Sequence, residues 1–370
     1  MERINLQNSN LTSDLMNKSA VARAVEVLAA GGLVIFPTET TYGAGVDATN
    51  PEAVQRLLRY KARREGKPLS IAVADVAMAE KYVELNAQAR TLYSQFLPGP
   101  VTVISAGKGK VAEGVQSEFG TLGIRIPDHQ LVRDIVFQLR RPITATSANP
   151  SDGARPYNLD SLFKTLSTAQ SGLIDLALDA GELVHNPPST IIDTTLSTPI
   201  TLRQGALSAP SPTVTANPNA RTIQVGQTRF QSASPEETVA VAGRLLLKHW
   251  SDIRNEGLII ALDGPLGAGK TVFSQGVAKF LGITDQLTSP TYTYIEEYPY
   301  TRHQTSGMLY HFDMWKVDTE KLFSRLEFDA VLKPKNIVVV EWFSQVKPFV
   351  ETVLAERPDM KQTILPITIE

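Results

Sequence analysis

The segment 264–271 reads GPLGAGKT and fits the phosphate-binding pattern G-x-x-x-x-G-K-[ST] at every specified position. Glycines let the backbone amides of such a loop curl around phosphate oxygens, and the N-terminus of the following helix favours their negative charge. We expect Lys270 to reach the β- and γ-phosphates and the Thr271 hydroxyl to hold Mg²⁺. An exposed glycine-rich turn is the alternative, but the apolar run 258–262 precedes the loop, as the motif requires. The expected nucleotide-binding residues are Gly264, Leu266, Gly267, Ala268, Gly269, Lys270, Thr271 and Val272.

Two carboxylates follow apolar runs further along the chain. Asp313 follows the run 308–312, and Glu341 follows the run 337–340. Carboxylates at separate strand ends beside a phosphate loop are what a Mg–ATP site needs, although each could instead be a satisfied charge at a strand end. No guanine-reading N-K-x-D box follows the loop, so a GTPase is not expected. The second half of the chain therefore predicts an ATP site.

Polar side chains also gather at the ends of apolar runs in the first half. They lie in PTETTYG at 37–43, in TATSAN at 144–149 and at Ser189. Together with Lys61 and Arg63, these hydroxyls and amides could grip a small polar substrate and a triphosphate. For each Ser or Thr alone the alternative is a turn or a cap, and for the basic run around the two cations it is a solvated helix face.

Composition is that of an ordinary globular protein. At 370 residues the chain exceeds one average domain, and 42% hydrophobic with 20% charged residues suits a packed core. No apolar run reaches the ~18 residues of a membrane span, and the N-terminus lacks the apolar stretch of a signal peptide. Cysteine is absent, which excludes disulfides and thiolate chemistry. We expect a cytoplasmic protein without membrane contact, whose net charge of −2 leaves no basic surplus for nucleic acid.

The apolar runs predict an α/β fold in two parts. Residues 1–207 alternate helices with strands and predict a large twisted sheet, whereas residues 233–370 predict a small three-layer unit around the phosphate loop. Between them, residues 208–232 contain three prolines and no acidic residue, which indicates a linker. The apolar residues within 223–230 could instead form an extra edge strand.

An ordered set of motifs in the second half resembles the TsaE family, which are small ATPases of the bacterial tRNA threonylcarbamoyladenosine pathway. The resemblance covers residues 235–350. It implies that Thr271 and Glu341 ligate Mg²⁺ and that Lys270 and Asp313 serve ATP turnover. The motifs are GPLGAGKT at 264–271, TSPTY at 288–292, YHFDMWK at 310–316, LEF at 326–328 and EW at 341–342. The sequence departs from the family pattern at Pro265, Trp315, Lys316, Phe343 and Ser344, which bears on partner contacts.

A second ordered set, in the first half, resembles the YrdC/TsaC family of L-threonylcarbamoyladenylate synthases. The resemblance covers residues 15–207 and includes the K-x-R and S-x-N signatures of that family. Leu97 stands where the family usually has Trp, and Asp152 lengthens one loop. The motifs are PTETTYG at 37–43, KAR at 61–63, KPL at 67–69, LPGPVT at 97–102, GIRIP at 123–127, SAN at 147–149, PST at 188–190 and LRQG at 202–205.

This second resemblance implies a reaction and a role for each motif residue. The family joins L-threonine, bicarbonate and ATP into threonylcarbamoyl-adenylate and pyrophosphate. Lys61 and Arg63 take the catalytic roles, and no general base stands out. The residues implied to hold threonine are Thr40, Tyr42, Arg125, Ala145 and Ser189. The residues implied to hold ATP are Lys61, Arg63, Lys67, Thr121, Ser147, Asn149 and Arg203.

Together the two resemblances predict a bifunctional fusion, in which a YrdC-like twisted α/β domain precedes a small P-loop ATPase domain. They imply that the adenylate passes to TsaD- and TsaB-type transferase proteins, which modify adenosine 37 of tRNA, and that the ATPase half supports that complex. One rival is a double-stranded RNA-binding or ribosome-associated protein with an appended ATPase, but the charge balance of the first half argues against it. Another is a P-loop small-molecule kinase, for which no lid or acceptor site is recognisable.

Overall fold

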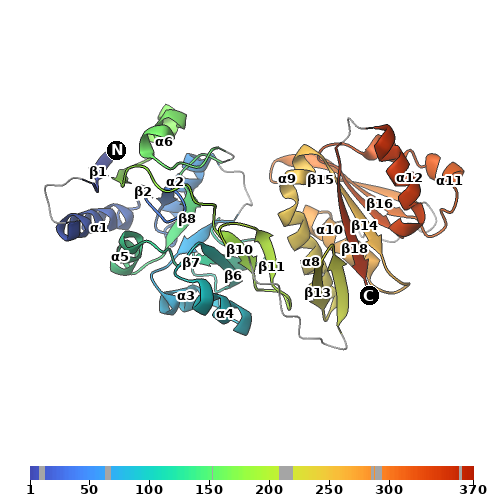
Figure 1. Ribbon diagram of the computed structural model, residues 1–370, viewed down its shortest axis with the longest axis horizontal. Coiled ribbons are helices and arrows are strands. Elements are labelled where there is room, and N and C mark those ends of the chain that lie inside the picture. Colours follow the sequence, from blue (N-terminus) through green and yellow to red (C-terminus); the bar gives the residue numbers. More distant parts are fainter. Residues whose placement is uncertain are drawn as a thin grey trace. The chain divides into compact units, whose positions relative to one another are not determined.

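The computed structural model describes residues 1–7, 13–62, 68–151, 153–207, 220–284, 287, 294–357 and 361–370. The chain divides into two compact units, each built on its own sheet (Figure 1). Unit 1 comprises Met1–Thr195 and Pro199–Pro210, and unit 2 comprises Leu196–Thr198 and Ser211–Glu370. The predicted α/β class is confirmed for both units.

The described part of unit 1 forms an 11-stranded mixed sheet with the order β1-β9-β2-β3-β8-β4-β7-β6-β10-β11, and β5 pairs with β6. Its central strands are buried on both faces, which explains their continuous apolar sequences. The strands are β1 (Glu2–Asn5), β2 (Val34–Phe36), β3 (Gly43–Gly45), β4 (Ser70–Ala72), β5 (Val83–Glu84), β6 (Val101–Gly107), β7 (Thr121–Arg125), β8 (Ile143–Ser147), β9 (Leu176–Asp179), β10 (Thr190–Asp193) and β11 (Ile200–Arg203).

Helices enclose this sheet, and α1 packs against α5. Helix α2 shows how the sequence sets its ends. Asn50 accepts hydrogen bonds from the amides of Glu52 and Ala53, and Pro51 occupies the first turn. The helix ends where Ala62 turns left-handed, with φ of 45°. The helices are α1 (Ser13–Ala29), α2 (Pro51–Lys61), α3 (Val76–Tyr82), α4 (Ala87–Phe96), α5 (Gln130–Leu139), α6 (Leu159–Thr165) and α7 (Thr168–Ser171).

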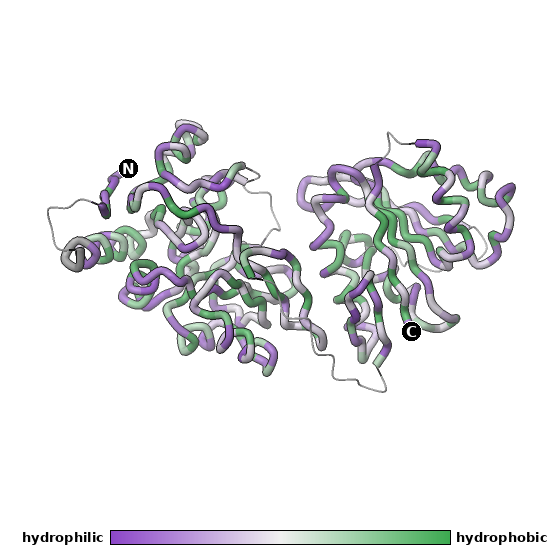
Figure 2. Tube along the Cα trace, viewed as in Figure 1, coloured by the Kyte–Doolittle hydropathy of each residue, from purple (hydrophilic) through white to green (hydrophobic). Residues whose placement is uncertain are grey.

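The described part of unit 2 forms a 7-stranded sheet with the order β13-β12-β18-β14-β17-β16-β15. Strands β18, β14, β17 and β16 are mutually parallel, and these strands run through a hydrophobic centre (Figure 2). The strands are β12 (Arg221–Val225), β13 (Thr228–Ser232), β14 (Leu258–Asp263), β15 (Ile295–Arg302), β16 (Thr305–Asp313), β17 (Ile337–Glu341) and β18 (Thr363–Ile369).

Helices on both faces of this sheet make the three layers that the sequence predicts. Helices α8 and α10 pack together on one face, and α11 and α12 cover the other (Figure 1). The second face buries Ile259 and Ala261 of β14 against Val346 and Val350 of α12. The helices are α8 (Pro235–Lys248), α9 (Trp250–Asn255), α10 (Lys270–Leu281), α11 (Glu320–Ser324), the 3₁₀-helix η1 (Phe328–Val331) and α12 (Phe343–Glu356).

The predicted linker over residues 208–232 is wrong at its C-terminal end. Strands β12 and β13 form an antiparallel hairpin around Gly226, and β12 also pairs with β18. The hairpin joins unit 2 because its apolar residues, Ile223 and Phe230, are 0% and 2% exposed there. The edge-strand alternative therefore describes residues 221–232, while 208–219 lie outside the described residues.

Replacing Phe230 with Ala should destabilise unit 2, because truncating a buried Phe costs about 3–5 kcal/mol. All three tryptophans, at 250, 315 and 342, lie in this unit, so their fluorescence during urea denaturation reports its unfolding. We expect a markedly lower midpoint for Phe230→Ala and an unchanged midpoint for Arg229→Ala, whose side chain is exposed on the same strand. An unchanged midpoint in the Phe230 variant would show that the hairpin does not contribute to the unit.

Candidate active sites

The loop 264–269 joins the end of β14 to the start of α10, as the motif requires. Gly264, Gly267 and Gly269 have φ of 145°, 78° and 107°, values that glycine adopts without the steric cost of a side chain. Gly269 precedes α10 and provides no side-chain cap for its first amides. These amides and the helix dipole can therefore receive an anion.

The two predicted carboxylates lie beside this loop at the ends of parallel strands. Asp313 ends β16 and Glu341 ends β17, where each is in register with the other. Glu341 is also in register with Leu262 of β14, just before the loop. The expected strands and strand-end positions are confirmed, and the parallel pairing brings both carboxylates to the edge of the sheet that carries the loop.

The Glu341 side chain is buried in a polar network. Its Oε1 lies 2.9 Å from His311 Nε2 and 3.1 Å from Ser274 Oγ, and its Oε2 lies 3.4 Å from Thr271 Oγ1. His311 and Glu341 are 0% and 2% exposed, so these contacts replace the water that the carboxylate loses on burial. The network points one carboxylate oxygen of Glu341 towards Thr271.

The ammonium group of Lys270 lies within the loop. It donates to the carbonyl oxygens of Gly264 (2.8 Å) and Pro265 (3.0 Å), and it lies 3.7 Å from the ring centroid of Trp342. Burial lowers the pKa of Lys270, and the nearby charges of Glu341, Asp313 and Asp263 oppose that shift.

Sequence reasoning missed several polar neighbours of this loop. Ser274 and His311 position Glu341, and Asp263 Oδ1 accepts a hydrogen bond from the Ser344 amide at the start of α12 (2.9 Å). Ser274 could have been found by its spacing, because it lies one helical turn after Thr271. No feature of the sequence singles out His311, because it occupies an ordinary alternating position within a strand.

The positions that depart from the TsaE pattern have distinct surroundings. The Pro265 carbonyl accepts from Lys270, as described above, and Ser344 contributes only its amide to the contact with Asp263. Phe343 is 7% exposed in the core, while Trp315 is 45% exposed and its ring lies tilted against that of Trp342, with 4.4 Å between the centroids. Lys316 is exposed, and the TSPTY motif at 288–292 lies outside the described residues.

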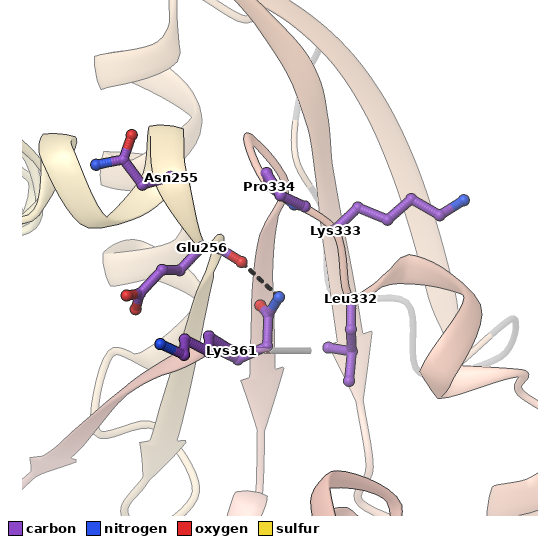
Figure 3. A pocket seen from close by; sticks show the side chains of 7 residues that line it. Asn255, Glu256, Leu332, Lys333, Pro334 and Lys361 are labelled. Carbon is purple, nitrogen blue, oxygen red and sulfur yellow. Dashed lines mark hydrogen bonds between the residues drawn. The ribbon is translucent and has the colours of Figure 1, made fainter. Parts of the chain in front are cut away.

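A cavity in unit 2 lies at the opposite edge of the sheet (Figure 3). Glu256 precedes β14, Lys333 precedes β17, and Lys361 and Gln362 precede β18. The Gln362 side chain donates to the Glu256 carbonyl across it (2.5 Å). The cavity therefore lies at the amino ends of the parallel strands, whereas ligands of such sheets bind at the carboxyl ends.

In unit 1, the loop between β2 and β3 meets the end of β7. Arg125 Nη2 donates to Thr40 Oγ1 (2.9 Å), and it lies 2.9 Å from Glu39 Oε1 in a pair whose side chains are 13% and 16% exposed. Both Glu39 carboxylate oxygens, Arg125 Nε and Nδ1 of the nearby His129 are buried without a hydrogen-bond partner among the described residues. Polar atoms in this state can bond a ligand. Glu39 and His129 were not predicted.

Lys61 fixes the S-x-N segment after β8. Its ammonium group donates to the carbonyl oxygens of Ser147 (2.6 Å) and Asn149, and it is 3% exposed. The Asn149 amide nitrogen donates to the carbonyls of Pro150 and Gly153, which leaves its buried Oδ1 without a partner among the described residues. Arg63 and Lys67, the other predicted cations of this segment, lie outside the described residues, as does Asp152.

Arg203, at the end of β11, holds the segment before β10. Its Nε and Nη2 donate to the Ser189 carbonyl at 3.1 and 2.9 Å. Desolvation of the guanidinium and the positive charges of Arg155 and Arg125 together lower the pKa of Arg203 to about 10. Three arginines thus share one electrostatic neighbourhood. Arg155 was not predicted, although it follows the S-x-N segment by a few residues.

The remaining predicted residues have different positions. Ala145 lies in β8, in register with Ser70 of β4. Thr121 begins β7, about 13 Å along the strand from Arg125 at ~3.3 Å per residue, and its hydroxyl lies 2.7 Å from that of Ser117. Tyr42 is fully buried and its hydroxyl is engaged by the turn after β9, to which it supplies both a donor and an acceptor.

Two of the three cations in α2 are engaged within the fold, and the third, Arg59, is exposed. Arg56 donates to the Leu173 carbonyl (2.8 Å) and pairs with Asp175 (2.9 Å), while Lys61 is buried as described. These contacts occupy charges that a polyanion would need.

Comparison with known proteins matches the two units to two families. The Sua5/yciO/yrdC family, described as "Telomere recombination", matches residues 26–205. The family described as "Threonylcarbamoyl adenosine biosynthesis protein TsaE" matches residues 232–364. No helix in the described part of the chain is both long and apolar enough to cross a membrane.

Individual relatives agree with the first family. A protein of Methanocaldococcus jannaschii is 35% identical over 177 residues, which are 48% of this chain and 81% of that protein. The threonylcarbamoyl-AMP synthase of Pyrococcus abyssi is 33% identical over 178 residues, 48% of this chain and 51% of that protein, so the match spans about half of its length. The crystal structure of P. abyssi Sua5 complexed with L-threonine has a TM-score of 0.50, 20% identity and 98% coverage of both chains, a likeness of fold.

The molecule is thus an α/β enzyme in which a large mixed sheet accompanies a P-loop unit. The chain belongs to the Sua5/YrdC family of threonylcarbamoyl-AMP synthases and carries a TsaE domain. Both resemblances seen in the sequence are confirmed, and both families belong to the biosynthesis of threonylcarbamoyladenosine in tRNA.

Replacing Tyr42 with Phe should destabilise unit 1. Its hydroxyl donates to the Gly181 carbonyl (2.8 Å) and accepts from the Ala180 amide (2.9 Å), so its loss leaves both without this partner, at about 1–3 kcal/mol. Burial, which raises the pKa of Tyr42 to about 12, keeps the hydroxyl protonated at neutral pH. Amide hydrogen exchange of residues 176–181 should accelerate in this variant. Tyr82→Phe is the control, because that hydroxyl has no hydrogen-bond partner among the described residues, and equal exchange in both variants would contradict the assignment.

Proposed function

We propose that unit 1 forms L-threonylcarbamoyladenylate from L-threonine, bicarbonate and ATP. The observation that carries this proposal is the group of three arginines, Arg125, Arg155 and Arg203, around strand ends that also present the Thr40 hydroxyl and the Ser189 segment. Such a group suits a substrate with a carboxylate together with a triphosphate. The threonine-bound relative supports the choice of amino acid.

Threonine would be held by the group around Arg125. The guanidinium suits the carboxylate of the amino acid, and the Glu39 carboxylate, whose oxygens accept no hydrogen bond from the described residues, suits its ammonium group. The proposed threonine residues are Thr40, Tyr42, Arg125, Ala145 and Ser189, of which Tyr42 acts from the core by supporting the loop.

ATP would lie along the S-x-N segment and Arg203. Lys61 shapes that segment, and the buried Oδ1 of Asn149 is an acceptor available to the nucleotide. The proposed ATP ligands are Lys61, Arg63, Lys67, Thr121, Ser147, Asn149 and Arg203.

The reaction itself requires mainly positioning. The threonine nitrogen forms a bond to the carbon of bicarbonate, with loss of water. A carbamate oxygen then attacks the α-phosphorus of ATP, and the bond to pyrophosphate breaks. Holding the reactants together and neutralising the charge that develops on the phosphates are both large effects in such transfers.

Unit 2 would hydrolyse ATP at the loop 264–271. The loop and the start of α10 would bind the phosphates, and Lys270 would exchange two carbonyl oxygens for phosphate oxygens. The oxygens of Thr271 and Glu341 fit Mg²⁺, since both are hard donors 3.4 Å apart and Glu341 is already oriented by His311 and Ser274. When bound, Mg²⁺ would neutralise charge on the β- and γ-phosphates.

In this proposal the two units serve one modification of tRNA. The adenylate would pass to TsaD- and TsaB-type transferase proteins that modify adenosine 37, and ATP turnover in unit 2 would support that complex in the cytoplasm. Contact with tRNA would be indirect, which accords with the pairing of Arg56 and the burial of Lys61 in α2. The same observation disfavours the alternative of a double-stranded RNA-binding protein.

Arg125→Ala should raise the KM for L-threonine at least tenfold, about 1.4 kcal/mol, because the carboxylate loses its cation. The measurement is pyrophosphate release in the presence of bicarbonate and ATP, with threonine varied. Arg90→Ala is the control, since Arg90 forms a surface ion pair with Glu80 on α4 and α3. A wild-type KM in Arg125→Ala would refute the threonine site.

Glu341→Gln should lower phosphate release at least ~100-fold, about 2.7 kcal/mol of barrier, while threonine-dependent pyrophosphate release stays unchanged. The amide loses the charge that Mg²⁺ requires but keeps the shape of the side chain. Glu351→Gln, at an exposed position of α12, is the control. If both activities fell together in Glu341→Gln, the two units would share one coupled site.

A further inference from the structure

Strand β12 belongs to neither of the matched regions. Those regions end at residue 205 and begin again at residue 232, whereas β12 runs from Arg221 to Val225. The strand is nevertheless paired on both sides, with β13 and with β18. Its side chains therefore belong to the sheet that carries the phosphate loop but lie outside both matched regions.

The first residue of β12 lies against that loop. A Cβ atom placed on Gly269 would lie 2.7 Å from Arg221 Nη1 and 3.5 Å from its Cζ. The backbone at the start of β12 is held in place, because Thr222 and Glu370 exchange two hydrogen bonds of 2.9 Å that align it with the end of β18. The end of β18 touches the loop in turn, since a Cβ on Gly264 would lie 2.2 Å from the Ile369 carbonyl oxygen.

The Arg221 guanidinium has no hydrogen bond or ion pair with any residue that the structure describes. It is half-buried, and it lies beside Gly269, the residue that precedes Lys270 in the chain. Arg203, by contrast, donates to a carbonyl oxygen. A guanidinium presents five donors in a planar fork that matches phosphate oxygens. Beside the uncapped amides of α10, Arg221 is therefore placed to donate to a phosphate bound there.

We propose that Arg221 binds the phosphate chain of the nucleotide held by the loop 264–271. The inference rests on the proposed nucleotide site of unit 2 and adds to it a residue from the junction between the matched regions. Arg221 would donate to phosphate oxygens from the side of Gly269, while Lys270 and the α10 amides contact them from within the loop. Gly269 is required there by its φ of 107°.

The test compares ATP binding by full-length variants, measured by calorimetry in the presence of Mg²⁺. Arg221→Ala and Arg221→Gln should each weaken ATP binding at least tenfold, about 1.4 kcal/mol, because both remove the charge. Arg221→Lys should fall between these variants and the wild type, since it keeps the charge without the fork. Arg229→Ala, an exposed arginine of the same hairpin, should bind ATP within twofold of the wild type.

Tryptophan fluorescence during urea denaturation shows whether each variant keeps unit 2 folded, and Arg221→Gln covers the case in which the Ala variant does not. Wild-type affinity in Arg221→Gln would overturn the inference and leave the nucleotide site of unit 2 standing. Absence of ATP binding by the wild type would instead overturn the proposed ATPase together with the role of Arg221. Equal weakening by Arg229→Ala would also overturn the inference, because general charge of the hairpin would then explain the effect.

Discussion

The parallel pairing of β17 with β14 and β16 is the constraint on which the site of unit 2 depends. Because parallel strands end at one edge of a sheet, the loop after β14 and the carboxylates that end the other two strands meet there. Glu341 can be buried at this edge only because His311 and Ser274 compensate its desolvation. The sheet thus fixes which residues meet, and the polar network fixes how the carboxylate points.

In unit 1, hydrogen bonds to neutral oxygens orient several of the cationic side chains. Lys61 is buried and held by carbonyl oxygens of the S-x-N segment, and the more exposed Arg203 is held by the Ser189 carbonyl. Neutral partners orient a cation without cancelling its charge, so an anionic ligand still gains from binding beside it. Arg125 differs from both, because it lies beside the Glu39 carboxylate, and both of these side chains are mostly buried.

The junction between the matched regions is part of unit 2. The hairpin of β12 and β13 extends the sheet and buries Ile223 and Phe230, so the chain that connects the units contributes to the fold of one of them. Composition could not reveal this, because prolines and polar residues dominate the segment as a whole and only alternate positions of its second half are apolar. Pairing with β18, more than a hundred residues later, decides which face those residues bury.

The sequence by itself determined the α/β class, the phosphate loop, the main strands and the strand-end positions of Asp313 and Glu341. These follow from apolar periodicity and from a motif whose spacing is local. Only the tertiary structure placed His311 beside Glu341 and brought the charge of Arg155 to bear on Arg203, since these residues are far apart in the chain. It also showed that Tyr42 is buried with its hydroxyl bonded to a distant turn. Local spacing specifies elements and motifs, whereas partners brought together by strand order depend on the pairing of the whole sheet.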